Sequence, residues 1–375
     1  MVQNAIMRKK FDNRMQLILI VEECKRSKNK KAYFTEYEIC SEGRIPGVLD
    51  YGSGALLCSL LQEKNQKGLY TYAVRVKHIE KEYKFDESSY SKEGYYFENG
   101  LIGELMALFS VYFQARFYLK ATVTGELTSK SLRLRSENEF QYKIPNPFLN
   151  FEMFSDQKRN WAYPDGLNAF LDTIGKLDQK YHQNLIRAFY WYAEAIKEIG
   201  IDHQLFFIKM VSAVESLLKF VEISPDSLNE KLRALIKNNS FTNDESSAIE
   251  RWFENRMIRQ RFASFLLQHS NNFFKGGKRK ARHCHIYKNQ LDKYAKHIYD
   301  ARSAYLHNGN PMYLSQDMRG EYAKDWDLDP SLGMMSDRKK FAASEKLPRT
   351  RWFERLVNLC FKNFIKHLTS NKIKE

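Results

Sequence analysis

The sequence is poor in cysteine and shows no metal-binding or disulfide framework. Its five cysteines are scattered and form no CxxC pair, and HExxH and clustered carboxylates at metal-ligand spacing are missing as well. Histidine and cysteine come together only in "HCH" (283–285), which would offer at most two ligands from one extended segment. We therefore expect no metal and no other cofactor, and a reducing, cytoplasmic environment.

Glycine-rich phosphate loops and long apolar runs are also missing. The glycines of "DYGSGALL" fit neither GxxxxGK(S/T) nor GxGxxG after a strand, which argues against nucleotide hydrolysis. The most apolar run, "LMALFSVYF" (105–113), is far shorter than the roughly 20 residues that cross a bilayer. The first residues, "MVQNAIMRKKFDNR", lack the apolar core of a signal peptide. We expect no membrane association and no secretion.

Positive charge is what the sequence has in excess. It carries 60 Lys and Arg against 45 Asp and Glu, a net charge of +15. Such a surface attracts polyanions, which means nucleic acid or an anionic membrane face. Hydrophobic residues make up 43% of the 375 residues, enough for two domains that each bury a core.

The N-terminal part of the chain predicts a mixed α/β domain. Three stretches rich in β-branched and aromatic residues predict strands: 15–23, 32–40 and 69–79. Residues 101–119 are apolar on nearly every face, which predicts a helix packed centrally against a sheet. Pro145 and Pro147 disfavour helix and central strand alike, so we place a domain boundary there, with residues 1–150 before it.

The remainder, residues 151–375, predicts an all-α bundle. Apolar residues recur there every three or four positions, as on one face of a helix. Five stretches follow this pattern: 184–199, 203–220, 246–267, 286–306 and 352–368. Because no repeat has a fixed period, we expect a bundle rather than a solenoid. The predicted fold class is α+β, an N-terminal mixed α/β domain followed by a helical bundle.

Two connections in the second half are unusual. "KGGKRKARHCH" (275–285) is a basic loop behind a Gly-Gly pair. Its cations either bind RNA phosphates or form a solvated surface turn; they are Lys278, Arg279, Lys280 and Arg282. Residues 312–347 form a connection far longer than usual between helices, which is typical of lids, binding loops or disordered segments.

An arginine and a histidine stand five positions apart in "YDARSAYLHNGNP" (299–311). On a straight helix, Arg302 and His307 would lie about 140° apart, so they would share a face only if the helix ended between them. Asn308 and Gly309 predict a left-handed helix cap, and Pro311 stops the helix from continuing. Alternatively, the two cations only complement the dipole of the helix C-terminus.

The phrase "YxxRSxxxHxG" within "IYDARSAYLHNGN", after an apolar helix with "AVESLLK" and before a final amphipathic helix, resembles the HEPN superfamily and its Apea-like branch. The resemblance covers about residues 180–370. It implies a helical bundle that dimerises, and metal-independent RNA cleavage in antiphage or toxin systems. Arg302 and His307 match the catalytic pair of that family, and Ser303 fits the polar residue that often follows the arginine.

The chemistry of metal-free RNA cleavage fits these residue types. It needs a base for the 2′-hydroxyl, an acid for the 5′-oxygen and a cation for the phosphate charge. Histidine serves as acid or base near neutral pH, and a guanidinium binds phosphate through two parallel hydrogen bonds. One motif supplies a single histidine, so a homodimer that joins two motifs in one cleft would complete the set.

Several roles remain open in the sequence. Glu215 would orient Arg302, or would pair with Lys219 or Arg233, because it faces the apolar side of its helix and needs a partner. Asn308 would contact phosphate or cap the helix.

The alternative to an enzyme is a non-catalytic module that binds RNA or a partner protein. A further hypothesis is that the N-terminal domain senses a phage product and that the enzyme is dormant without it.

Overall fold

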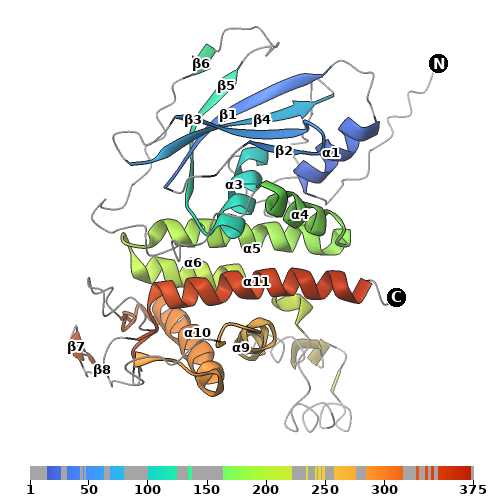
Figure 1. The fold of residues 1–375 in the computed structure, drawn as a ribbon. Coiled ribbons are helices and arrows are strands. Elements are labelled where there is room, and N and C mark those ends of the chain that lie inside the picture. The colour runs from blue at the N-terminus through green and yellow to red at the C-terminus, as the bar shows by residue number, and fades with distance from the viewer. Residues whose placement is uncertain are drawn as a thin grey trace, which may run out of the picture.

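The structure is a computed structural model. The residues that it describes are 15–26, 32–42, 45, 48–62, 68–79, 100–124, 134–136, 164–221, 234, 241–242, 244–245, 247–249, 257–275, 284–315, 327–328, 334–336, 339–341 and 345–372. The fold is α+β, with an antiparallel sheet and its helices first and a helical region second (Figure 1).

The N-terminal sheet has six strands in the order β2-β3-β4-β1-β5-β6. The strands are β1 (Tyr33–Ser41), β2 (Leu49–Tyr51), β3 (Leu56–Gln62), β4 (Tyr70–His78), β5 (Phe117–Thr124) and β6 (Leu134–Ser136). Every pairing is antiparallel, and Ile39 of β1 lies opposite Tyr72 of β4 and Leu119 of β5. The strands predicted over 32–40 and 69–79 are confirmed as β1 and β4.

The strand predicted over 15–23 is wrong, because these residues belong to the helix α1 (Gln16–Arg26). Its buried residues are Leu17, Ile18, Ile20 and Val21, a spacing that places all four on one helical face. The first turn of α1 is anchored by Glu104, whose carboxylate accepts hydrogen bonds from the backbone N–H groups of Gln16 and Leu17 at 3.0 and 2.9 Å. Tertiary burial and this distant anchor outweigh the strand propensity of the isoleucines and the valine.

Three helices lie between the sheet and the rest of the molecule (Figure 1). They are α1, α3 (Gly100–Phe113) and α4 (Pro164–Gly175). The helix predicted over 101–119 is confirmed as far as Phe113 but is wrong beyond it. The chain turns at Gln114, which has a φ of 52°, and the aromatic and β-branched residues that follow form β5.

The second half is mostly helical, as predicted, but it is not all-α, because residues 334–336 and 339–341 pair as two strands. Its helices are α5 (Gln179–Glu198), α6 (His203–Glu215), α9 (Ile258–His269), α10 (Leu291–Asn308) and α11 (Thr350–Lys372), with short 3-10 turns η2 (Leu218–Phe220) and η4 (Lys288–Gln290) and a hairpin of β7 (Met334–Ser336) and β8 (Lys339–Phe341). The helix predicted over 203–220 is too long: it ends at Glu215, and Ser216 caps it by turning its hydroxyl back to the carbonyl of Ser212 at 3.0 Å. Competition of this kind weakens a helix end.

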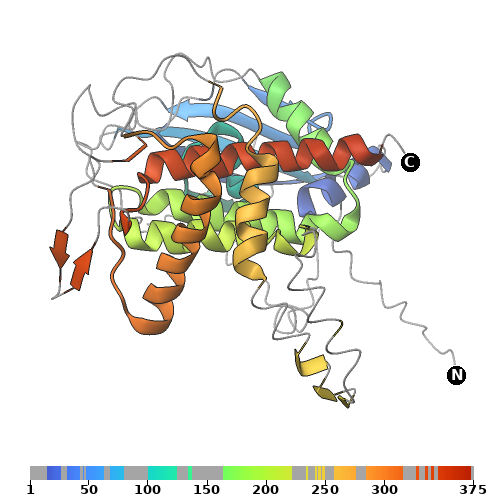
Figure 2. The same ribbon diagram turned by 90° about the horizontal axis from the view of Figure 1, so that it is seen from below.

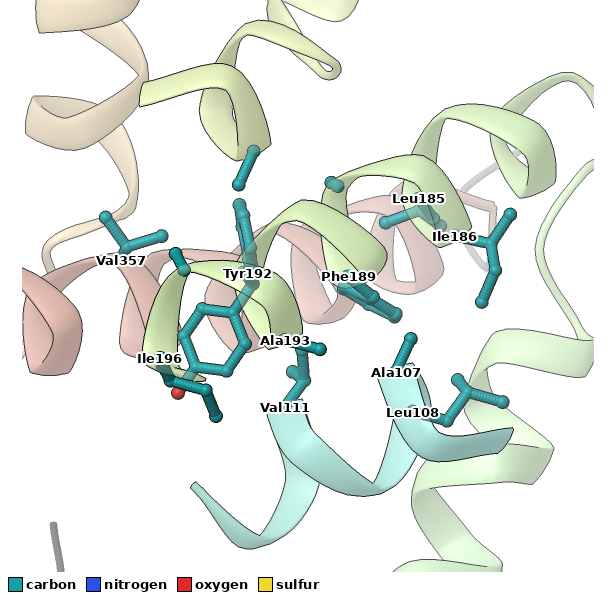
Figure 3. Close-up of a cluster of buried hydrophobic side chains, with 14 of the residues drawn as sticks. Ala107, Leu108, Val111, Leu185, Ile186, Phe189, Tyr192, Ala193, Ile196 and Val357 are labelled. Carbon is teal, nitrogen blue, oxygen red and sulfur yellow. The ribbon is translucent and has the colours of Figure 1, made fainter. Parts of the chain in front are cut away.

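The sheet half and the helical half share one hydrophobic core. Figure 3 shows Ala107, Leu108 and Val111 of α3 facing α5, with Phe189 and Tyr192 among the residues that meet them. A buried polar cluster crosses the same junction, because the Asn358 side chain of α11 donates to the Val111 carbonyl at 2.7 Å and to the Tyr192 hydroxyl at 3.1 Å. The boundary predicted near residue 150 lies outside the described residues, and the parts on either side of it are packed together.

Of the helices in the described ranges, none combines the length and the apolarity that crossing a bilayer requires.

Candidate functional site

The Arg-His motif lies on the last two turns of α10. This helix continues through Asn308 and ends at Gly309, whose φ is 66°. The N–H groups of Gly309 and Asn310 donate to the carbonyls of Tyr305 and Ala304 at 3.0 and 3.3 Å, which satisfies the free carbonyls of the last turn. The predicted cap is confirmed. The helix does not end between Arg302 and His307, so in one chain the two side chains leave it about 140° apart.

Arg302 is held by an ion pair with Glu215. Its Nη2 donates to the Glu215 Oε2 at 2.8 Å, and the two side chains are 17% and 23% exposed. The guanidinium also lies over the Tyr299 ring, 6.0 Å from its centroid. Its Nε is buried and has no hydrogen-bond partner among the described residues. The ion pair and the ring contact hold the guanidinium in place, while its Nε–H makes no hydrogen bond with the described residues.

Glu215 occupies the last position of α6, where it faces α10. Burial raises the pKa of its carboxyl group, and the neighbouring Arg302 cation and Tyr299 hydroxyl act in the opposite direction. Of the partners that the sequence left open for Glu215, the structure supplies Arg302. Lys219 lies over the Phe220 ring at 4.8 Å instead, and Arg233 lies outside the described residues.

His307 and Asn308 are exposed, and Ser303 is half-buried. The buried residues of α10, Leu291, Ala295 and Ile298, all belong to its first half. The end of the helix extends past the layer formed by α5 and α6 (Figure 2). Leu306, next to His307, is 48% exposed. The structure therefore presents the His307 imidazole on a projecting helix end beside an uncovered leucine.

The segment after the helix is fixed by a residue that sequence reasoning missed. The Gln204 side chain, in the first turn of α6, accepts a hydrogen bond from the Met312 backbone N–H at 3.0 Å. Further along, the Tyr313 carbonyl accepts from the Leu347 N–H at 2.8 Å, and the Ser315 hydroxyl donates to the Leu347 carbonyl at 2.6 Å. No sequence signal identifies Gln204, because its contact depends on how α6 packs beside the end of α10.

The sequence also singled out the basic loop and the "HCH" segment. The basic-loop residues Lys278, Arg279, Lys280 and Arg282 lie outside the described residues. In the "HCH" segment, the His285 Nδ1 lies 3.3 Å from the Asp327 Oδ2, and both side chains are buried or nearly so. This pair ties two connections together. Within the described ranges, no group of three or more His, Cys, Asp or Glu side chains is placed to hold a metal ion.

Comparison with known proteins adds no relative: no protein-family model, no curated protein and no solved structure matches this chain.

Proposed function

We propose that this chain is a metal-independent endoribonuclease of HEPN type that cleaves RNA through attack by the substrate's own 2′-hydroxyl, with Arg302 and His307 as its catalytic residues. The observation that carries the proposal is the pairing of Arg302 with Glu215 at 2.8 Å on the helix that presents an exposed His307. A fixed cation and an accessible imidazole are two of the three groups that such a cleavage requires, and a second imidazole would complete the set. The net charge of +15 favours a polyanionic substrate.

The geometry of α10 favours a homodimer as the active form. Because Arg302 and His307 leave one continuous helix about 140° apart, a single copy does not direct both side chains at one phosphodiester. Two copies that meet at the projecting ends of α10 would bring two imidazoles and two guanidinium groups into a shared cleft. One imidazole would then remove the 2′-hydroxyl proton while the other protonates the 5′-oxygen.

The physiological role follows from the resemblance. A cytoplasmic toxin or antiphage effector would use this site to degrade host or phage RNA. The sheet half would then be the part that binds a regulatory partner, such as a phage-derived trigger. The basic loop with Lys278, Arg279, Lys280 and Arg282 would add affinity for the RNA backbone without selecting a sequence.

One observation favours a second candidate, a non-catalytic module that binds RNA or a partner protein. The guanidinium of Arg302 is already paired, and its side chain is 17% exposed, as in a purely structural ion pair. In that case the only role of His307 would be to interact favourably with the partial negative charge at the C-terminus of α10. The enzyme and the binding module differ in turnover, not in affinity for RNA.

The deciding experiment is incubation of the purified chain with total RNA or tRNA in EDTA. We expect cleavage that leaves a 2′,3′-cyclic phosphate and a 5′-hydroxyl, since the nucleophile is the 2′-hydroxyl. His307→Ala should abolish cleavage and leave RNA affinity unchanged, whereas Lys293→Ala, at an exposed position of the same helix, should have no effect. Full activity of His307→Ala would refute the catalytic assignment, and RNA binding without cleavage by the wild type would favour the binding module.

A mixed dimer tests the shared cleft. A dimer with one wild-type subunit and one His307→Ala subunit lacks either the acid or the base, so we expect it to lose nearly all activity. Half of the wild-type activity would show that each subunit acts alone and would contradict the shared cleft, as would cleavage by a protein that is monomeric in light scattering.

A further inference from the structure

Arg116 is a fully buried arginine at the end of the sheet that faces the helical half. Its side chain is 2% exposed, and its Nε lies 2.7 Å from the Oε1 of Glu42, which is 7% exposed. The backbone N–H of Arg116 also donates to the Glu42 Oε2 at 3.2 Å. Because Glu42 directly follows β1 and Arg116 directly precedes β5, this pair joins the ends of two neighbouring strands.

The same guanidinium reaches the helical half. Its Nη1 donates to the backbone carbonyl of Ile199 at 3.2 Å, and Ile199 is the C-cap residue of α5. A cation at this place neutralises the partial negative charge of the free carbonyls at a helix C-terminus. The sheet half thus supplies the cap for the end of α5.

The end of α5 is joined to the start of α6 by a short, well-bonded turn. Ile201 and Asp202 donate from their N–H groups to the Glu198 carbonyl at 2.8 and 2.9 Å. The Asp202 side chain then caps α6 by accepting from the Leu205 N–H at 2.9 Å. Lys209, two turns into α6, forms an ion pair with Glu198 of α5. A displacement of the α5 end would therefore displace α6 with it.

Both ends of α6 contact the candidate site. Gln204, in its first turn, holds the Met312 N–H at 3.0 Å, and Glu215, its last residue, holds Arg302 at 2.8 Å. In the sequence, one contacted residue, Arg302, precedes His307, and the other, Met312, follows it. The position of α6 thus determines where the guanidinium of Arg302 sits and how the chain leaves α10.

We propose that Arg116 is a positioning residue through which the sheet half sets the arrangement of Arg302 and of the end of α10. Its contacts with Glu42 and Ile199 connect β1 and β5 to α6, and α6 connects to the site. A partner that separates Glu42 from Arg116 would release the α5 cap and loosen the site, whereas a partner that strengthens their contact would tighten it. The proposal rests on the proposed function only in treating Arg302 and His307 as catalytic.

Hydrogen exchange in the full chain tests the connection without relying on activity. Arg116→Lys keeps a cation beside Glu42, but its single shorter ammonium does not reach both Glu42 and the Ile199 carbonyl in the manner of the guanidinium. We expect exchange at the Asn310 and Met312 amides to become about tenfold faster, the effect of weakening one charge-assisted hydrogen bond. The control is Tyr51→Phe, which removes the 3.1 Å hydrogen bond from Tyr51 to Asp172 of α4, another contact between the halves. It should leave these amides unchanged.

A second variant keeps the test decisive if Arg116→Lys does not fold. Glu42→Gln keeps the shape of the side chain that holds Arg116 but weakens the contact by removing its charge, so exchange should again increase at Asn310 and Met312. Unchanged exchange at Asn310 and Met312 in both variants would overturn the proposal, and so would an equal change in Tyr51→Phe.

Kinetics separate this inference from the proposed function. With RNA as substrate, Arg116→Lys should lower kcat and leave KM unchanged, because the site is disordered while RNA binding is retained. A raised KM with an unchanged kcat would contradict a positioning role. A wild type that cleaves no RNA would refute the proposed function, and the exchange measurements would still decide whether Arg116 controls the end of α10.

Discussion

At the scale of single residues, the carboxylates of Glu215 and Glu104 have different tasks. Glu215 holds the Arg302 guanidinium, while Glu104 holds the backbone of α1. The first is partly exposed and faces a cation; the second is 2% exposed and accepts hydrogen bonds from two backbone N–H groups. Removing the negative charge of Glu215 should therefore change the rate of RNA cleavage. Removing that of Glu104 should change how the free energy of unfolding depends on pH.

We expect Glu215→Gln to lower kcat for RNA by about ten- to a hundredfold, because an amide keeps the shape of the side chain but holds a guanidinium less firmly than a carboxylate does. The free energy of unfolding should change by no more than about 1 kcal/mol, since the pair is partly solvated. Steady-state kinetics and urea unfolding measure the two effects. The matched control is Glu194→Gln, which breaks a pair with Lys197 at similar exposure; equal effects on kcat in both variants would contradict an orienting role for Glu215.

Glu104 predicts a pH dependence of stability. Burial raises the pKa of its carboxyl group from 4.5 to about 7, although two backbone hydrogen bonds act against the shift. Between these two pH values the folded chain keeps the proton and the unfolded chain loses it, so the free energy of unfolding falls as pH rises. The total loss from this one group is about 3 kcal/mol.

We expect Glu104→Gln to remove this contribution, so that the free energy of unfolding falls less between pH 4.5 and pH 7 than in the wild type. Urea unfolding at several pH values measures it. Glu22→Gln serves as the control because Glu22 lies on α1 in a surface pair with Arg26. The same pH slope in Glu104→Gln and wild type would show that Glu104 is ionised throughout this range.

At the scale of elements, the sequence predicts best those segments whose stability is local. The strands over 32–40 and 69–79, the helices over 184–199 and 352–368 and the Gly309 cap follow from side-chain periodicity and turn chemistry alone, whereas the predicted stretches 203–220 and 286–306 exceed the helices α6 and α10. The misassigned stretch 15–23 is held as a helix by Glu104, 87 residues away, and no local pattern contains that information. The same reason explains why Glu215 could be named as a partner of Arg302 while Gln204 was missed: a carboxylate on an apolar face needs a partner, whereas a glutamine in a first turn does not.

The cap of α10 gives a prediction at this scale. Gly309 adopts a φ of 66°, and a Cβ there would meet nothing within 4 Å, so the cost of a side chain comes from the left-handed backbone alone. We expect Gly309→Ala to lower the free energy of unfolding by about 1 kcal/mol and to speed hydrogen exchange at the Asn310 amide. Gly309→Asn should cost less, since asparagine tolerates this conformation. Equal stability of all three proteins in urea would show that the cap does not hold the helix end.

At the scale of the whole molecule, the shared core makes the two halves one folding unit. Phe189 of α5 is fully buried and packs against Phe170 of α4 and Phe361 of α11, with ring centroids 6.4 and 5.8 Å away. The Phe170 ring also lies 5.4 Å from the Tyr112 ring of α3, so the aromatic contacts extend from the sheet half into the helical half, beside the polar cluster of Asn358.

We expect Phe189→Ala to lower the free energy of unfolding by about 3–5 kcal/mol, because it leaves a cavity that the packed rings do not fill. Native-state hydrogen exchange should then accelerate together in β4 and in α11. Val48→Ala, at a position 62% exposed, should change neither. Acceleration confined to the helical half would show that the halves unfold independently.

The contact of α11 with α3 has a consequence for synthesis on the ribosome. The Asn358 side chain satisfies the Val111 carbonyl from 247 positions further along the chain, and Lys362 does the same for the Tyr112 carbonyl at 3.2 Å. During translation, the sheet and α3 are synthesised before α11. Until α11 is made, the apolar surface of α3 that it covers is exposed and can bind chaperones. A messenger cut short before α11 would therefore yield a product that fails to complete its packing.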